Sequence, residues 1–133
     1  MTLNNTDLLN LSLEQTASTL GDPTNAVFEL LYQRHPDLEA FRREDNQWQH
    51  YMIQEILQNL MEMAENPDTA LAIIRDMTLH HQMIGLETDT FKGMYRALQD
   101  VIVAQLTGPH RDEMVGLWDG VVERICKNVD AAF

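Results

Sequence analysis

The chain has 133 residues, which is the usual length of one globular domain. A hydrophobic content of 44% predicts a folded core, and a formal net charge of -12 disfavours nucleic acid and anionic membrane surfaces as partners. No apolar run is long enough to cross a bilayer, no secretory leader is visible, and the single cysteine, Cys126, suits a reducing compartment. We therefore expect one cytoplasmic domain over residues 1–133, with no nucleic-acid and no membrane partner.

Two helix starts are marked in the first quarter of the chain. The segment Ser12-Leu-Glu-Gln15 has the form of a capping box and predicts a short helix that ends near Gly21. Residues 1–11 could then form a loose N-terminal segment. Asp22-Pro23 combines an N-cap residue with a proline for the first turn, which predicts a second helix running to His35.

The middle of the chain alternates turns with helices. Pro36 cannot continue the second helix and predicts a short turn through Phe41. Residues 42–47 form a polar connector, and apolar residues that recur at intervals of three and four over residues 48–64 predict a long third helix. Asn66-Pro67 is another cap followed by a proline, so it predicts the start of the next helix.

Residues 69–95 hold the pattern that points most directly to a function. An amphipathic helix presents His80-His81 in its last turns, and Gly85 then breaks it. A histidine that leaves a rigid apolar helix just before a glycine break is what an axial haem ligand requires. A further helix over residues 90–106 and a last one after Gly108-Pro109 complete an all-α domain of about seven helices, one of them very short.

In this order the chain resembles the bacterial single-domain haemoglobins and the globin half of the flavohaemoglobins. Three places carry the likeness: residues 28–38 (FELLYQRHPDL), residues 73–81 (IIRDMTLHH) followed by Gly85-Leu86 and Phe91, and Trp118 after a helix-breaking Gly-Pro. The likeness spans roughly residues 12 to 130. It implies a globin-like fold whose helices pack around a pocket for haem b.

Carried over residue by residue, the resemblance implies that His81 is the proximal histidine and the ligand of the haem iron, with Met77 under its ring. Gly85, four residues later, sets this register. His80 points about 100° away on the same helix, so it cannot share the slot and is expected to be a partly exposed neighbour. Leu86 matches the apolar residue that lies against the haem edge.

The residue expected on the distal side of the haem is found by counting back along the chain from His81. This spacing places the distal position at Gln49, with Ile53 one turn later over the iron. A register shifted by one residue would choose His50 instead, but it would also place polar Gln54 in an apolar pocket. Gln49 could donate a hydrogen bond to a bound ligand, whereas His50, if it turned inward, could become a sixth iron ligand.

Three phenylalanines match further positions of the family. Phe28 stands in the second helix where many oxygen-handling bacterial members carry tyrosine. Phe41 is the candidate for stacking on the macrocycle, although the connector from Phe41 to Gln49 is shorter than the family pattern. Phe91 stands where the family places a tyrosine beside the proximal histidine, and the partner glutamate position falls near Phe133. The absence of this polar pair argues against nitric oxide dioxygenase turnover.

We expect first a haem globin that reversibly binds a diatomic gas, O2 or else NO or CO, for transport or sensing. A second hypothesis is a haem-free globin-fold module that regulates through protein contacts. A third is a haem enzyme, with nitric oxide dioxygenase or weak peroxidase activity and an external reductant. Enzyme activity is the less favoured expectation. The last two helices could also form a homodimer face, as they do in some relatives.

Several of these residues have a plainer interpretation as well. A lone histidine on an apolar helix face is usually a buried or solvated side chain without a ligand. The eight methionines would fill an irregular core as readily as they would line a cofactor pocket. Gln49 and His50 could be surface residues of their helix, and Cys126 is expected to pack within the last helix rather than act as a nucleophile.

Overall fold

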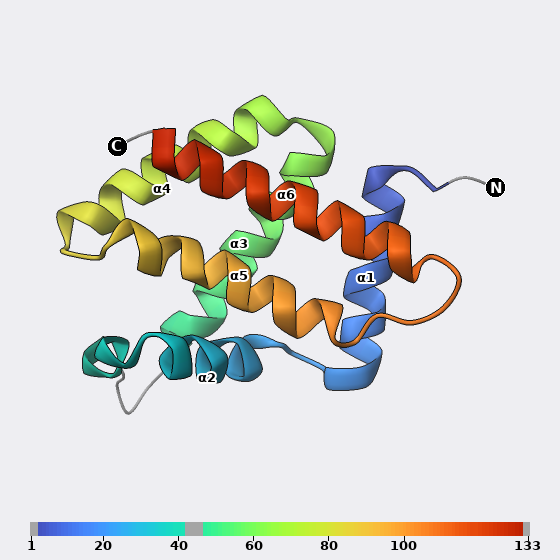
Figure 1. Cartoon of the computed structure of the whole chain (residues 1–133), viewed down its shortest axis with the longest axis horizontal. Coiled ribbons are helices and arrows are strands. Elements are labelled where there is room, and N and C mark those ends of the chain that lie inside the picture. Colours follow the sequence, from blue (N-terminus) through green and yellow to red (C-terminus); the bar gives the residue numbers. More distant parts are fainter. Residues whose placement is uncertain (1–2, 42–46, 132–133) are drawn as a thin grey trace.

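The fold consists of helices joined by short connections (Figure 1). The computed structural model describes residues 3–41 and 47–131. Within those ranges there are six α-helices, one 3-10 helix and no strand, so the predicted all-α class is confirmed. The elements are α1 (Asn5–Leu20), α2 (Thr24–Arg34), η1 (Pro36–Phe41), α3 (Gln47–Glu65), α4 (Pro67–Met83), α5 (Thr88–Val103) and α6 (Arg111–Ala131).

The first helix begins earlier than the sequence pattern predicts. The Asn4 side chain accepts a hydrogen bond from the backbone N–H of Asp7 at 2.8 Å, and the Asp7 carboxylate accepts one from the backbone of Asn4. These two residues form the capping box, and Ser12 lies inside the helix instead. Leu9 is buried, so the described part of residues 1–11 is not a loose segment.

The predicted starts of the second and fourth helices are close to those observed. The Asp22 carboxylate accepts hydrogen bonds from the hydroxyl and backbone N–H of Thr24, which opens α2. These bonds hold the pKa of Asp22 below its usual range. Pro67 opens α4 as predicted, but the Asn66 amide donates to the carboxylate of Glu62 rather than capping the helix.

The core is built around the last two helices, which lie side by side along the length of the molecule (Figure 1). Trp118 of α6 is almost completely buried, and its indole N–H donates to the Ser12 hydroxyl of α1 at 2.9 Å. The Ser12 hydroxyl in turn donates to the backbone carbonyl of Leu9 at 2.7 Å. Cys126 is buried in α6, and burial raises the pKa of its thiol, as expected for a packed cysteine.

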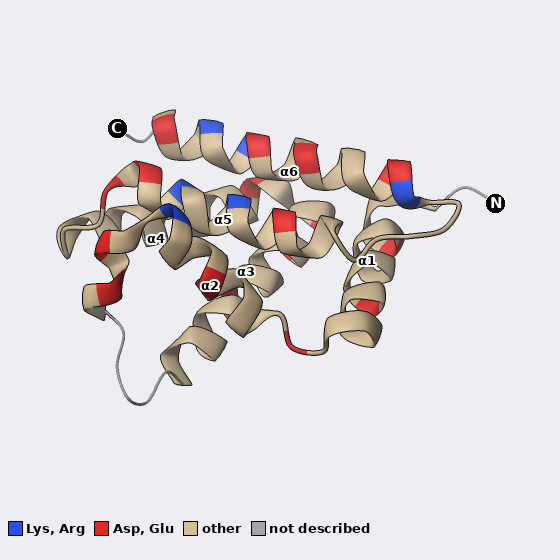
Figure 2. Cartoon of the chain, turned by 60° about the horizontal axis from the view of Figure 1, so that its bottom comes forward, with Lys and Arg blue, Asp and Glu red and all other residues tan. Residues whose placement is uncertain are grey.

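Acidic residues are distributed over many helices rather than gathered in one patch (Figure 2). Several form exposed ion pairs, such as Arg34 of α2 with Asp100 of α5 at 2.5 Å and Lys92 of α5 with Asp130 of α6 at 2.8 Å. Exposed pairs of this kind add little to stability. None of the helices in the described ranges has both the length and the apolar character needed to span a bilayer.

The hydrogen bond between Ser12 and Trp118 gives a test of the core. Replacing Ser12 by Ala leaves the buried indole N–H without an acceptor, which costs about 1–3 kcal/mol. We therefore expect Ser12→Ala to lower the free energy of unfolding by that amount in urea titrations.

Ser18 of α1 provides the matched control because it is exposed on the same helix. Ser18→Ala makes the same chemical change and should alter the unfolding free energy by no more than about 0.5 kcal/mol. Equal stabilities of the two variants would show that the indole hydrogen bond does not hold α1 against α6.

Candidate functional site

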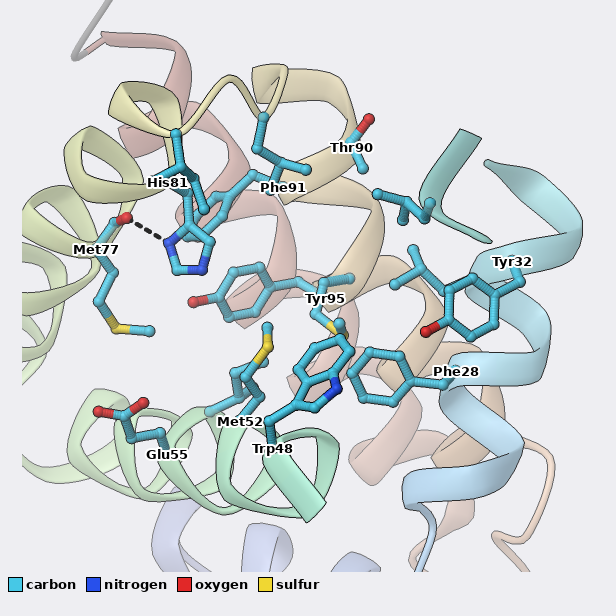
Figure 3. A pocket seen from close by; sticks show the side chains of 16 residues that line it. Phe28, Tyr32, Trp48, Met52, Glu55, Met77, His81, Thr90, Phe91 and Tyr95 are labelled. Carbon is cyan, nitrogen blue, oxygen red and sulfur yellow. Dashed lines mark hydrogen bonds between the residues drawn. The ribbon is translucent and has the colours of Figure 1, made fainter. Parts of the chain in front are cut away.

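An apolar cavity of about 380 Å³ lies among α2, η1, α3, α4 and α5 (Figure 3). This volume is within the usual range of about 300–1,000 Å³ for ligand and cofactor pockets. Its wall is mostly aliphatic, aromatic and thioether side chains, with few polar groups. The lining residues are Phe28, Leu31, Tyr32, Leu38, Trp48, Met52, Glu55, Ile56, Met77, His81, Ile84, Leu86, Thr90, Phe91, Met94 and Tyr95.

His81 projects from α4 into this cavity (Figure 3). Its Nδ1 lies 2.7 Å from the backbone carbonyl oxygen of Met77, one turn earlier on the helix. A carbonyl can only accept a hydrogen bond, so Nδ1 must carry the proton and donate it. In the neutral ring, Nε2 is then left with a lone pair. The imidazole is therefore fixed in the tautomer that ligates a metal through Nε2.

Gly85 positions His81 by ending α4 in a defined way. Gly85 has a φ of 92°, a left-handed conformation that favours glycine. The backbone N–H of Leu86 donates to the His81 carbonyl at 3.1 Å, and that of Gly85 donates to the Gln82 carbonyl at 3.0 Å. Together these two bonds form a Schellman motif, which keeps His81 in the last turn and brings Leu86 back to line the cavity.

Two aromatic residues of α5 support the imidazole. The Phe91 ring lies 5.1 Å from the ring of His81, at an interplanar angle of 49°. Tyr95, one turn later, packs edge-on against Phe91 with a centroid distance of 5.7 Å. Both rings also line the cavity. The imidazole is therefore held by the Met77 carbonyl at Nδ1 and by ring packing against α5.

Across the cavity, α3 presents a different face from the one predicted. Met52, Ile56 and Trp48 line the wall, whereas Gln49 and Ile53 do not. Ile53 is 2% exposed and belongs to the hydrophobic core. Met52 and Ile56, which line the cavity, are thus three positions after the predicted Gln49 and Ile53, because α3 packs against α1 on one side and against the cavity and α4 on another. Apolar periodicity does not tell two buried faces apart.

Gln49 and His50 both have other partners. The Gln49 side-chain amide is buried and donates to the Tyr32 hydroxyl at 2.8 Å. His50 lies outside the cavity lining, with its Nδ1 2.9 Å from a carboxylate oxygen of Asp22. The structure therefore turns both candidate distal residues away from the cavity.

Five of the nine expected site residues meet at the cavity: Phe28, Met77, His81, Leu86 and Phe91. Phe41 closes η1, and its side chain lies outside the described part of the chain. His80 is exposed, as expected for the neighbour of the pocket histidine. Trp48 lines the cavity without having been predicted to do so, and it packs edge-on against Phe28 at a centroid distance of 5.5 Å. Trp48 lies one helical turn before Met52, and this spacing in the sequence could have indicated that the two residues share one face of α3.

Tyr95 is another lining residue that was not among the predicted site residues. Its side chain is 1% exposed, and burial raises the pKa of its hydroxyl well above the usual range. Among the described residues, its hydroxyl oxygen is the one buried side-chain polar atom without a hydrogen-bond partner. The hydroxyl points into the cavity (Figure 3). It is therefore a neutral and unpaired donor inside an otherwise apolar space.

Comparisons with protein-family models, with curated proteins and with solved structures gave no match to the chain. The resemblance to bacterial haemoglobins therefore remains a prediction from the residues themselves. In the described ranges, no group of three or more His, Cys, Asp or Glu side chains is placed to hold a metal ion. The cavity offers one imidazole, held in a defined tautomer, and an apolar wall.

The tautomer of His81 can be tested without any ligand. In the neutral imidazole of His81 we expect the proton to be on Nδ1 because the Met77 carbonyl accepts it. Long-range 1H–15N correlation spectra of the labelled protein distinguish the two ring nitrogens. His80 is exposed and should instead show the tautomer mixture of free histidine. A proton on Nε2 of His81 would contradict the geometry.

Proposed function

We propose that this cavity binds haem b, that His81 Nε2 is the iron ligand, and that the protein reversibly binds a diatomic gas. One observation carries the proposal: the His81 ring projects into an apolar cavity with its Nδ1 committed to the Met77 carbonyl. Haem iron in globins needs one axial imidazole from the protein. The position and the tautomer of His81 support that role.

The residues of the cavity fit a flat, largely apolar group. Burial of an apolar ligand contributes about 25 cal/mol for each Å² removed from water, and the lining is apolar over most of its area. Phe91 would hold the imidazole from the side of α5, and Leu86 would contact the edge of the group. Met52 and Ile56 close the wall contributed by α3. Thioether side chains adapt to irregular shapes, which suits such a wall.

When bound, haem would supply an iron able to bind O2, NO or CO. The chain supplies orientation and exclusion of water. The Met77 carbonyl prevents rotation of the His81 ring, and its own helical position makes that acceptor rigid. The apolar side chains of Met52 and Ile56 keep the space opposite α4 free of competing polar groups.

The backbone carbonyl that accepts the hydrogen bond of His81 favours gas binding over catalytic turnover. A carboxylate beside Nδ1 would make the imidazole a stronger electron donor, whereas a backbone carbonyl is a neutral acceptor. The family's tyrosine position is occupied by Phe91, which packs against His81 and cannot donate a hydrogen bond. The corresponding glutamate position, near Phe133, lies outside the described residues. An enzyme role with an external reductant is the less supported proposal.

The globin-like arrangement of helices is part of this proposal. It is supported by the element order, in which a short 3-10 helix follows α2 and the cavity lies between α3 and α4. A haem-free regulatory module would use the same helices, and no contact in the cavity favours it over haem binding. A homodimer through α5 and α6 likewise stays a prediction.

The test is an absorption spectrum of the purified protein after haem is supplied. We expect a Soret band that shifts when CO is added to the reduced protein. His81→Gly should lose tight haem binding, and added imidazole should restore the band by filling the space of the deleted ring.

His80→Gly is the matched control because His80 is the preceding residue of α4 and is exposed. Both substitutions place glycine in the same helical turn, at a similar cost of about 1 kcal/mol. His80→Gly should leave the spectrum unchanged. A wild-type protein that never acquires a Soret band would favour the haem-free module, and an unchanged spectrum in His81→Gly would exclude this ligand assignment.

A further inference from the structure

The charge of the cavity wall favours one class of ligand. Within the described chain no lysine or arginine lines the cavity, and Glu55 of α3 is the one carboxylate that does. Glu55 is exposed, and no ion pair joins its carboxylate to another described residue. The charge that the described wall presents to a ligand is therefore negative, and a cation complements it.

The Glu55 carboxylate lies at one side of an otherwise apolar space. Figure 3 shows Glu55 at the edge of the cavity near Met77, whereas Trp48 and Phe28 lie on the other side. The Phe28 ring packs edge-on against Trp48 at 5.5 Å, and its centroid is 6.0 Å from that of Tyr32. The cavity thus has an anionic edge and an aromatic end, which suits a ligand with one charged head and an apolar body.

The hydroxyl of Tyr95 is a second group that a ligand would satisfy. The side chain is 1% exposed, and its hydroxyl has no hydrogen-bond partner within the described chain. An unpaired buried hydroxyl costs stability, and phenylalanine would fill the same space without that cost. The hydroxyl points into the cavity (Figure 3). Burial is the main cause of the raised pKa of Tyr95, and Cys126 and Glu55 add to it, so the Glu55 carboxylate is near this hydroxyl.

An ammonium group matches these two side chains. It carries three N–H donors and the charge opposite to that of Glu55, and the oxygen of a neutral phenol can accept one of its hydrogen bonds. Cations are also attracted to the faces of aromatic rings such as those that line this cavity. The formal net charge of -12 raises the concentration of cations around the whole protein.

A carboxylate head group does not match the described wall. It would be repelled by Glu55 and would find no cationic side chain among the described lining residues. Such a head would have to remain in solvent, as the carboxylates of haem b would. The cavity therefore distinguishes ligands of similar size by the sign of their charge.

We propose that in the absence of haem the cavity binds an apolar primary amine, with its ammonium group between the Glu55 carboxylate and the Tyr95 hydroxyl. The apolar body of the amine packs toward Phe28 and Trp48. This inference goes beyond haem binding and does not rest on it, because no iron and no contact with His81 is required. The amine and haem share one cavity, so they exclude each other.

The test compares three eight-carbon probes that differ in the head group: n-octylamine, 1-octanol and octanoate. Each is titrated calorimetrically at pH 7 into the full chain without haem. Octylamine is then protonated, since alkylammonium groups such as that of lysine have a pKa of about 10.4. We expect octylamine to bind about tenfold more tightly than octanol, because it adds a charge-assisted hydrogen bond, and octanoate to bind most weakly. Equal binding of octylamine and octanol, or tighter binding of octanoate, would overturn the inference.

The apolar body is tested by the length of the amine. From hexylamine to octylamine the affinity should rise about fourfold for each added methylene, since each one is removed from water in the cavity. An affinity that does not change with chain length would place the amine on the surface and contradict the inference.

Glu55→Gln removes the charge and keeps the size of the side chain. It should weaken octylamine binding about fivefold and leave octanol binding unaltered. Glu65→Gln is the matched control, because Glu65 is exposed on the same helix and outside the cavity lining. This control should change octylamine binding by less than about twofold. An equal loss in both variants would indicate a general attraction of cations to the acidic protein instead of a site.

Tyr95→Phe tests the second contact. It should weaken octylamine binding about fivefold, since one net hydrogen bond is lost, while the ligand-free variant melts at the wild-type temperature or higher. Wild-type affinity for octylamine in this variant would remove Tyr95 from the site. A lower melting temperature would show that the hydroxyl has a structural partner, which also contradicts its assignment to the ligand.

These measurements separate the inference from the proposed function. A protein that never acquires a Soret band but binds octylamine through Glu55 supports this inference and contradicts haem binding. A protein with a Soret band and no Glu55-dependent binding of octylamine gives the reverse result. If both ligands bind, octylamine should slow the uptake of haem. Uptake at an unchanged rate would place the amine outside the cavity and refute the site.

Discussion

The hydrogen bond from His81 Nδ1 to the Met77 carbonyl is the constraint on which the functional account depends. It decides which ring nitrogen keeps a lone pair and fixes the direction of that lone pair toward the cavity. The bond exists because α4 continues as a regular helix through His81, and α4 stops where it does because Gly85 adopts a left-handed conformation. The conformation of Gly85 therefore determines where α4 ends and keeps His81 in its last turn.

The cavity itself follows from how the surrounding helices share their apolar residues. One face of α5 carries aromatic rings that pack against the His81 imidazole, and another face packs against α6 in the core. Some apolar residues of α3 pack against α1, and others line the cavity. Most of the lining is apolar, so the few polar groups act in a medium where a hydrogen bond is strong. In that setting the Tyr95 hydroxyl, which is an unpaired donor, and the Nε2 lone pair of His81 are two polar groups that a ligand would meet.

The sequence predicted those features that depend on local chemistry. Pro67 and Gly85 set the two ends of α4, because each fixes a backbone state, and His81 consequently lies where the pattern placed it. The register of α3 could not be predicted, since both of its faces are buried and spacing along the chain does not measure the path of a connector. Nor could the pattern reveal that Gln49 would pair with the Tyr32 hydroxyl, which is a contact between separate helices.

The most direct test of the account is a crystal structure of the haem-loaded protein. The account predicts a haem between α3 and α4, with the iron bound by His81 Nε2 while Nδ1 still donates to the Met77 carbonyl. An iron bound by a different side chain, or a His81 ring rotated away from Met77 so that Nδ1 faces the metal, would contradict it.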